Sequence, residues 1–304
     1  MTAGRVLLTG VLGFSGQYLA RKLHADGFEV HGIARCSDAE GSADLPVVLR
    51  RADIRRADEI RAILLESRPN YVVHLAGISH AAHGNLEELY LNNVVGTRVL
   101  LGELASATRD VEHVILASSA NVYGNQEVSI LHEGLPQNPV NDYGVSKVAV
   151  EHLGAMFSDR LPITTVRPFN YTGVGQSTSF LIPKIVEHFR KKEPFIQLGN
   201  LDVARDFSDV RDICAMYGNL LGRASAYGQV VNLCSGNANP LRTILAICRQ
   251  MTGLDLQVRV NPDLVRANEV RSLSGSTALL DELVGPLTRI PLERTLNWML
   301  GAQA

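Results

Sequence analysis

The chain has 304 residues, of which 46% are hydrophobic and 20% charged, so it can bury a large core and lacks the composition of a disordered or membrane-embedded protein. Its 29 basic and 31 acidic residues give a net charge of −2, which excludes an overall field that would attract nucleic acid. We find no signal peptide, no long uncharged apolar run and no CxxC spacing, and therefore expect a protein of the reducing cytoplasm with no membrane partner.

A glycine-rich turn follows the first predicted strand. The apolar run Arg5–Thr9 leads into Gly10, Gly13 and Gly16 and then into an amphipathic helix that contains QYLARKL. The first glycine permits a tight turn, the second lets a pyrophosphate approach the backbone, and the third allows close packing of helix on strand. A structural glycine turn is the alternative, but a second strand, EVHGIA, follows where a dinucleotide site requires one. We therefore predict dinucleotide binding.

Arg35 directly follows EVHGIA, where an NAD site usually presents an acid to the ribose 2′-hydroxyl. An arginine can pair with a 2′-phosphate instead, although an exposed arginine at a strand end is also ordinary. We expect NADPH, with NADH as the alternative. The nearby stretch LRRADIRRADEIRAIL is interrupted by acids and carries no stacking aromatics, which favours a solvated helix face over a nucleic-acid interface.

Predicted strands and helices alternate through the first half of the chain. The strand-like runs are VVLRRA, YVVHLAG, HVILASS and ITTVRP, with one long helix through EELYLNNVVGTRVLLGELA. This alternation predicts an α/β fold with a doubly wound parallel sheet. Beyond ITTVRP the pattern is irregular, with helices near FLIPKIVEHFRKK, DVRDICAMYGNLL and PLRTILAICRQM. We expect a Rossmann domain over residues 1–166, with parts of 200–235, and an interleaved, mixed α/β substrate lobe over 167–304.

Tyr143 and Lys147, in the segment YGVSK, are four residues apart and so share one face of a predicted helix. A tyrosine titrates near pH ~10, and a nearby positive charge lowers that pKa toward the neutral range. The same spacing occurs on many solvated helices. Here, however, Ser118 and Ser119 end the strand HVILASS, where a hydroxyl could polarise a carbonyl rather than only bond the local backbone. We predict that Ser119, Tyr143 and Lys147 act together.

Several segments together resemble the extended short-chain dehydrogenase/reductase family, in its nucleotide-sugar branch, over nearly the whole chain. TGVLGFSG is similar to that family's glycine loop, NNVVGT to its central helix, SSANVYG to its catalytic strand end and YGVSK to its catalytic helix. RPFN and RDFSDVRD resemble its substrate-side segments. The resemblance implies an NAD(P)-dependent oxidoreductase, in which tyrosine donates a proton while the nicotinamide carries the hydride.

The resemblance also implies roles for single residues. The catalytic set would be Ser119, Tyr143 and Lys147. The expected cofactor contacts are Gly10, Gly13, Phe14, Ser15, Gly16, Arg35, Asp53, Ile54, Leu75, Ala76, Gly77, Asn93, Tyr143 and Lys147. The expected substrate contacts are Ser79, Asn121, Asn170, Lys184, Arg205, Arg266 and Glu269. The two arginines would grip the substrate diphosphate, and surface ion pairing is the alternative for them.

Within this branch, RPFNYTGVGQ and LGNLDVARDFSDVRD are most similar to enzymes that act on GDP-sugars. Those that remove water from the hexose carry a glutamate where this chain has Asn121, and an amide cannot accept that proton. The resemblance therefore implies reduction of GDP-4-dehydro-6-deoxy-D-mannose to GDP-D-rhamnose. The configuration of the product at carbon four, D-rhamno or 6-deoxy-D-talo, stays open because it depends on the orientation of the sugar.

Other interpretations are a nucleotide-sugar 4-epimerase that holds NAD tightly, an enzyme like GDP-mannose 4,6-dehydratase, and a non-catalytic dinucleotide sensor. The sensor is disfavoured because Tyr143 and Lys147 are both present.

His80 and His83 lack an evident third ligand, so we expect no metal site. The helices carrying LNNVVGTRVLL and YGVSKVAVEHLGAMF resemble those of a four-helix dimer interface, which implies a homodimer.

Overall fold

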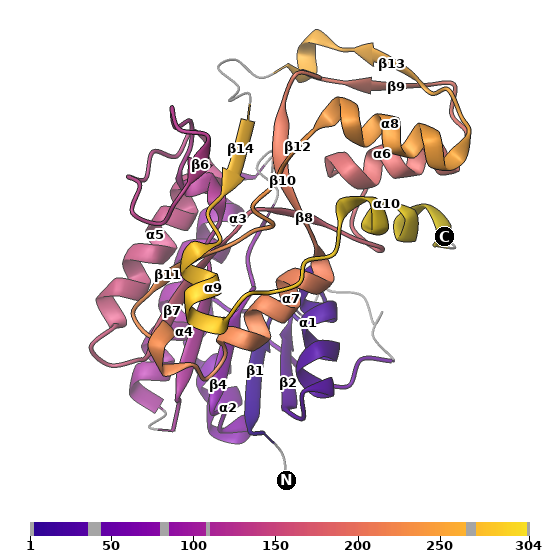
Figure 1. Ribbon diagram of the computed structural model, residues 1–304. Helices are drawn as coiled ribbons and strands as arrows, with labels where there is room; N and C mark the ends of the chain where they lie inside the picture. Colours follow the sequence, from indigo (N-terminus) through magenta and orange to yellow (C-terminus); the bar gives the residue numbers. More distant parts are fainter. Residues whose placement is uncertain (1–2, 36–43, 80–84, 108–109, 266–271, 303–304) are drawn as a thin grey trace.

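The computed structural model describes residues 3–35, 44–79, 85–107, 110–265 and 272–302. Its centre is a seven-stranded parallel sheet in the order β11-β7-β5-β4-β1-β2-β3. These strands are β1 (Arg5–Thr9), β2 (Glu29–Ala34), β3 (Val48–Arg51), β4 (Tyr71–His74), β5 (His113–Ala117), β7 (Ile163–Pro168) and β11 (Val230–Leu233). The predicted doubly wound α/β fold is confirmed (Figure 1). The strands inside the sheet are buried on both faces, which explains their apolar runs, whereas the edge strand β3 is largely exposed or half-buried.

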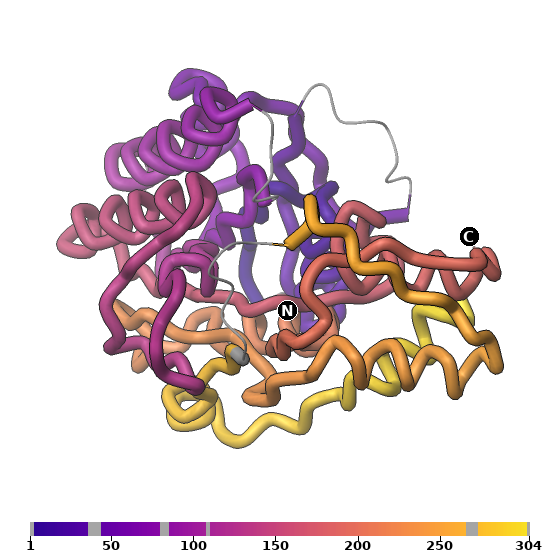
Figure 2. Tube along the Cα trace, turned by 90° about the horizontal axis from the view of Figure 1, so that it is seen from above, coloured from indigo at the N-terminus to yellow at the C-terminus, as the bar shows by residue number. Residues whose placement is uncertain are grey.

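Helices cover both faces of this sheet (Figure 2). Helices α1 (Phe14–Ala25), α7 (Val210–Leu220) and α9 (Ala278–Val284) contribute to one apolar cluster with β1 and β11. Helices α2 (Ala57–Ser67), α4 (Gly96–Ala107) and α5 (Asp142–Phe157) contribute to a second cluster on the other face. Of these, α7 and α9 come from the second half of the chain. The two halves of the sequence are therefore interleaved in space.

The long helix expected through residues 87–105 forms with an interruption. It consists of α3 (Leu86–Tyr90), a π-helical turn (Leu91–Val95) and α4. Asn85 caps its start, because its side chain accepts a hydrogen bond from the backbone N–H of Glu88 at 3.0 Å. A π turn changes which side chains face inward, and in this one the polar Asn93 is buried, at 1% exposure.

The second lobe lies beyond the carboxyl ends of the large sheet (Figure 1). Helices α6 (Leu181–Arg190), α8 (Leu241–Thr252) and α10 (Leu292–Gly301) share its apolar core. Its strands are β6 (Ile130–Leu131), β8 (Asn170–Thr172), β9 (Phe195–Leu198), β10 (Ala204–Asp209), β12 (Ala238–Pro240), β13 (Gln257–Val260) and β14 (Ser272–Gly275). β8 follows β7 almost directly and pairs with β10, so it joins the two lobes. No helix in the described ranges is long and apolar enough to cross a membrane.

Candidate active site

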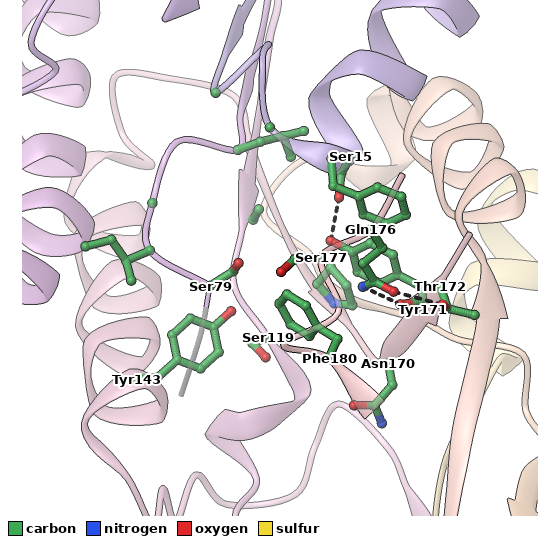
Figure 3. A pocket seen from close by; sticks show the side chains of 18 of the residues that line it. Ser15, Ser79, Ser119, Tyr143, Asn170, Tyr171, Thr172, Gln176, Ser177 and Phe180 are labelled. Atoms are coloured by element: carbon green, nitrogen blue, oxygen red, sulfur yellow. Dashed lines mark hydrogen bonds between the residues drawn. The ribbon is translucent and has the colours of Figure 1, made fainter. Parts of the chain in front are cut away.

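A cavity of about 1070 Å³ lies between the two lobes. Its walls come from the loops that follow β1, β2, β4 and β5, from α5, and from residues of β8, β10 and the start of α6. This is the place where parallel α/β sheets bind ligands, since the loops at the carboxyl ends of the strands diverge there. Figure 3 shows the hydroxyls of Ser79, Ser119 and Tyr143 beside this cavity.

The glycine loop packs so closely on neighbouring backbone that two of its glycines have no room for a side chain. Gly10 has φ +71°, and a Cβ there would lie 2.9 Å from the backbone nitrogen of Ala76. A Cβ on Gly16 would lie 2.2 Å from the carbonyl oxygen of Gly10. The first turn of α1 begins directly after Gly13 and contains no acid. Free N–H groups and bare backbone at this helix start fit the diphosphate of a dinucleotide.

The structure brings the three predicted catalytic residues to one wall of the cavity. Ser119 follows β5 and caps a short helical turn, while Tyr143 and Lys147 lie one turn apart on α5. The exposed fractions of the three side chains are only 6–7%. Lys147 Nζ donates to the carbonyl oxygen of Ala117 at 2.7 Å and lies 5.9 Å from the centre of the Tyr143 ring. A phenol, a hydroxyl and an amine are thus held together with little contact with bulk water.

The electrostatics of Tyr143 differ from the expectation. Burial raises the pKa of its hydroxyl to about 12, and this outweighs the hydrogen bond with Ser119, which lowers it. The net shift of the Tyr143 pKa toward the neutral range that we expected is therefore wrong for this structure, because burial dominates. Burial also lowers the pKa of Lys147 to about 8, against the opposing effect of the Glu151 carboxylate. At neutral pH the tyrosine accordingly keeps its proton and the lysine is mostly charged.

Asn93 ties the active-site segments together rather than lining the cavity. Its Oδ1 accepts from the backbone N–H of Ile78 at 2.7 Å, and its Nδ2 donates to the Ile78 carbonyl at 3.1 Å and to Ser146 Oγ at 3.0 Å. Ser146 in turn donates to the carbonyl of Tyr143. The side chain of Asn93 therefore fixes the loop after β4 against the helix that carries Tyr143.

A buried chain of hydrogen bonds runs from Thr9, at the end of β1, to Asn93 in the π-helical turn. Ala76 N–H donates to Thr9 Oγ1 at 3.0 Å, and Thr9 Oγ1 lies 2.7 Å from His74 Nδ1. The Thr97 hydroxyl donates to the carbonyl of Asn93, so Thr97 Oγ1 accepts from the other ring nitrogen of His74 at 2.9 Å. Burial lowers the pKa of His74 to about 3, so the ring is neutral and its Nδ1 accepts from the Thr9 hydroxyl. Sequence reasoning did not identify this chain.

The remaining cofactor-side residues fall into three groups. Ile54, Leu75, Ala76 and Gly77 line the cavity with the glycine loop. Arg35 also lines it, with a side chain that is 57% exposed and a guanidinium 3.7 Å from the Glu88 carboxylate. Asp53 lies between the lining residues Ala52 and Ile54, but its carboxylate binds the guanidinium of Arg55. Arg55 therefore competes with the cofactor for the Asp53 carboxylate.

Of the predicted substrate-side residues, some line the cavity, one does not, and two lie outside the described residues. Ser79, Asn121, Asn170 and Arg205 line the cavity. Lys184 is not among the lining residues, because its ammonium donates to the carbonyl of Gln197 on β9 at 2.9 Å. Arg266 and Glu269 lie outside the described residues, as do His80 and His83. Within the described ranges there is no group of three or more histidine, cysteine, aspartate or glutamate side chains arranged to hold a metal ion.

Several cavity residues were not predicted as site residues. The most prominent come from the segment after Asn170: Tyr171, Thr172, Gln176 and Ser177. Tyr171 bonds Ser15 in the glycine loop, and Gln176 connects Thr172 with the carbonyl of Tyr171 (Figure 3). The position of Tyr171, next to Asn170 in RPFNYTG, was the available signal. No local pattern in the sequence shows that residues 171–177 contact α1.

The family model described as the NAD dependent epimerase/dehydratase family matches residues 6–234. The chain belongs to this family. It is 31% identical to GDP-6-deoxy-D-talose 4-dehydrogenase of Aggregatibacter actinomycetemcomitans, over 92% of this chain and 91% of the relative. It is 30% identical to GDP-6-deoxy-D-mannose reductase of Pseudomonas aeruginosa, over 97% and 96%. The UDP-glucose 4-epimerase of Streptomyces lividans is 27% identical over 91% and 89%.

Solved structures agree with this assignment to the epimerase/dehydratase family of extended dehydrogenases. A candidate epimerase from Burkholderia cenocepacia J2315 superposes with a TM-score of 0.93 at 43% identity, covering 98% of this chain and 97% of that one. The RMD enzyme of Pseudomonas aeruginosa, complexed with NADPH, gives 0.84 at 28% identity over 99% and 97%. MoeE5, in complex with UDP-glucose and NAD, gives 0.87 at 26% identity over 98% and 97%. The RMD structure thus contains NADPH and the MoeE5 structure contains NAD.

Proposed function

We propose that this enzyme reduces the 4-keto group of a GDP-4-dehydro-6-deoxyhexose, with GDP-4-dehydro-6-deoxy-D-mannose as substrate and GDP-D-rhamnose as product. The observation that carries the proposal is the buried set of Ser119, Tyr143 and Lys147 on one wall of a cavity that also reaches the glycine loop. Two relatives at 30–31% identity are named for GDP-6-deoxyhexoses, which supports GDP over UDP as the nucleotide.

Tyr143, Ser119 and Lys147 each have a separate role in the proposed reaction. When bound, the reduced nicotinamide supplies a hydride to carbon four of the sugar. The Tyr143 hydroxyl, protonated at neutral pH, donates its proton to the oxygen on which negative charge develops. Ser119 donates a hydrogen bond to the same oxygen, and the Lys147 charge stabilises the phenolate left on Tyr143. The burial of all three strengthens these interactions because water is excluded.

Asn121 supports reduction over removal of water. Its amide lies on the cavity wall and donates to Ser119 Oγ at 3.1 Å. A dehydratase needs a base at this place, and an amide has no basic lone pair to accept a proton. Reduction needs no such base, because the only proton transfer goes from Tyr143 to the sugar oxygen.

A 4-epimerase is the second candidate, since the Streptomyces lividans relative at 27% identity is named for that activity and the same three residues would serve it. We favour the reductase and NADPH because Arg35 lines the cavity after β2, where its guanidinium can exchange Glu88 for a 2′-phosphate.

The surface carrying Val95, Val145 and Met156, which are 42%, 42% and 68% exposed, is our proposed homodimer interface. Light scattering of the purified protein measures the oligomeric state.

The test is a direct assay. The protein is incubated with GDP-4-dehydro-6-deoxy-D-mannose and either NADPH or NADH, nicotinamide oxidation is followed, and the sugar is identified by NMR. Faster oxidation of NADPH with a D-rhamno product supports the proposal. A 6-deoxy-D-talo product would make the enzyme a reductase that attacks the opposite face. In a parallel incubation with UDP-glucose, formation of UDP-galactose with no net oxidation would favour the epimerase over the reductase. Cofactor binding without turnover of either sugar would favour the sensor.

A further inference from the structure

Asn121 holds the hydroxyl of Ser119 with two donors at once. Its backbone N–H donates to Ser119 Oγ at 3.2 Å, and its side-chain Nδ2 donates to the same oxygen at 3.1 Å. A hydroxyl oxygen has two lone pairs, so both acceptor positions of Ser119 are occupied. The single hydrogen of Ser119 must therefore point away from Asn121, as a donor to another group.

The orientation of the Asn121 amide follows from its neighbours. The backbone N–H of Gly144, in the first turn of α5, donates to Asn141 Oδ1 at 2.8 Å. The Nδ2 of Asn141 therefore faces Asn121, where it donates to Oδ1 at 3.5 Å. Because the oxygen of the Asn121 amide faces Asn141, its nitrogen is the atom that faces Ser119. A backbone N–H of α5 thus fixes the direction of each hydrogen bond up to Ser119.

The turn that carries Asn121 packs directly against the start of α5. A Cβ on Gly144 would lie 2.8 Å from the carbonyl oxygen of Asn121, so this close approach requires glycine. Asn121 lines the cavity, whereas Asn141 is not among the described lining residues. The chain of hydrogen bonds therefore begins outside the cavity and ends at its wall.

A Ser119 that can only donate suits the proposed reduction. The ketone oxygen of the sugar gains negative charge as the hydride arrives, and a donor that is already oriented stabilises this charge. The Tyr143 hydroxyl lies beside Ser119 (Figure 3). Ser119 cannot accept the Tyr143 proton, because Asn121 occupies both of its lone pairs. That proton is left for the sugar oxygen.

We propose that Asn121, held by Asn141 at the start of α5, is a positioning residue that commits the Ser119 hydroxyl to donate to the sugar oxygen and prevents it from accepting the proton of Tyr143. The proposal rests on the proposed function, whose reaction it leaves unchanged. It differs from the direct substrate contact that the resemblance implies for Asn121, because a positioning residue acts only while the Ser119 hydroxyl is present.

A double-mutant cycle separates the two roles. Asn121→Asp and Asn121→Ala are each made with Ser119 and with Ser119→Ala, and kcat and KM are measured at saturating cofactor. An ionised aspartate keeps the shape of asparagine but has only acceptors, so the Ser119 hydrogen turns toward it. We expect Asn121→Asp to lower kcat about a hundredfold, as the loss of one oxyanion donor does, and Asn121→Ala to lower it less. KM should stay within about twofold of wild type.

In the Ser119→Ala protein, Asn121→Ala should lower kcat no further, and Asn121→Asp should show only the effect of its added charge. Asn92→Asp is the matched control for that charge. Asn92 also lines the cavity, but its Nδ2 donates to the carbonyl of Glu88 at 2.8 Å. Its effect on kcat should be the same in both Ser119 backgrounds. Equal losses in both backgrounds for the Asn121 variants would mean that Asn121 acts on the sugar directly and would overturn the proposal.

Asn141→Asp tests the chain from its other end. Aspartate caps a helix as well as asparagine does, so thermal unfolding should be unchanged. It cannot donate to Asn121 Oδ1, so the Asn121 amide is free to turn its oxygen toward Ser119. We expect kcat to fall, and this fall to disappear in the Ser119→Ala protein. An unchanged kcat would reject α5 as the origin of the orientation.

The same measurements distinguish this proposal from the proposed function. The cycle is measured with GDP-4-dehydro-6-deoxy-D-mannose, or with UDP-glucose if the wild-type protein epimerises that sugar instead. Wild-type protein that turns over neither sugar would remove the proposed function and this proposal together. An active wild type whose Asn121 and Ser119 variants show additive losses would remove this proposal alone.

Discussion

At the scale of single residues, the active site depends on two buried groups that titrate on opposite sides of their usual values. The Tyr143 pKa is raised to about 12 and the Lys147 pKa is lowered to about 8, in both cases chiefly by burial. Burial disfavours whichever form carries charge, so the phenol stays neutral and the amine loses its proton more easily. The site is consequently prepared to donate a proton, not to accept one.

Replacing Tyr143 by phenylalanine should remove the proton donor and keep the aromatic ring. We expect turnover to fall at least about a hundredfold, the usual contribution of a positioned acid, with cofactor Kd within about twofold of wild type. Initial rates and a cofactor titration measure the two effects. Tyr90→Phe is the control, because the Tyr90 hydroxyl binds Asp142 outside the cavity lining. Near-normal turnover of Tyr143→Phe would exclude this tyrosine from the mechanism.

The pH profile should report Lys147. Its ammonium is present below pH about 8 and is lost as the pH rises through that value, so turnover should be level below it and decline above. Lys147→Arg keeps its charge at all accessible pH values, and its slower turnover should show no decline in this range. Rates between pH about 6 and 10 test this. An unchanged decline in the arginine variant would assign it to another group.

At the scale of elements, α5 carries both the proposed catalytic groups, Tyr143 and Lys147, and the residue that supports their position. One turn beyond Lys147, the buried Glu151 forms a two-pronged ion pair with Arg167 of β7, with N–O distances of 2.7 and 2.9 Å. Ser118 also donates to this carboxylate, so the helix, β7 and the residue before Ser119 are joined at one point. The position of α5 therefore depends on a charge pair that water does not reach.

Glu151→Gln should destabilise the protein strongly, because it leaves the Arg167 guanidinium buried without its counter-charge. Loss of one partner from a buried pair costs about 3–5 kcal/mol in unfolding free energy. Urea unfolding measures this change. The control is Asp202→Asn, which breaks an ion pair with Arg242 in which both side chains are mostly exposed, so its unfolding midpoint should hardly move. Similar losses for the two variants would contradict the account of α5.

The sequence could predict those elements that depend on interactions between residues close together in the chain, and not the contacts between residues far apart in it. The strands around β1 and the helix that carries Tyr143 depend on local periodicity and glycine spacing, and as elements of structure they were predicted correctly. Lys184 and Asp53 were placed in the site by resemblance, but Lys184 binds a carbonyl of β9 and Asp53 binds Arg55. Ser15 and Tyr171 are 156 residues apart, and no local pattern signals such a contact.

At the scale of the whole molecule, buried neutral histidines connect segments that are distant in sequence. His74 connects Thr9 of β1 with Thr97 of α4. At the opposite end of the sheet, His113 accepts from the backbone N–H of Gly222 at 3.0 Å and contacts Thr164 Oγ1 at 2.8 Å. Burial lowers the pKa of His74 to about 3 and that of His113 to about 4. Each ring must stay uncharged for these contacts to persist.

Acid should therefore destabilise the fold through these two residues. An unfolded histidine titrates near pH ~6.5, so between that value and pH 3–4 the unfolded chain binds more protons than the folded one, and stability falls as the pH is lowered. Each histidine contributes a slope of up to about 1.4 kcal/mol per pH unit in this window. Urea unfolding at a series of pH values measures the slope.

The variant His74→Gln tests the assignment, because glutamine cannot take up a proton. It should be less stable than wild type at neutral pH, since glutamine cannot reproduce both ring hydrogen bonds, yet its stability should fall less steeply below pH about 6.5. His24→Gln, at an exposed position on α1, should keep the wild-type slope. If His74→Gln lost stability as steeply as wild type on acidification, protonation of other groups would have to drive the transition, and the buried chain from Thr9 to Asn93 would have no part in it.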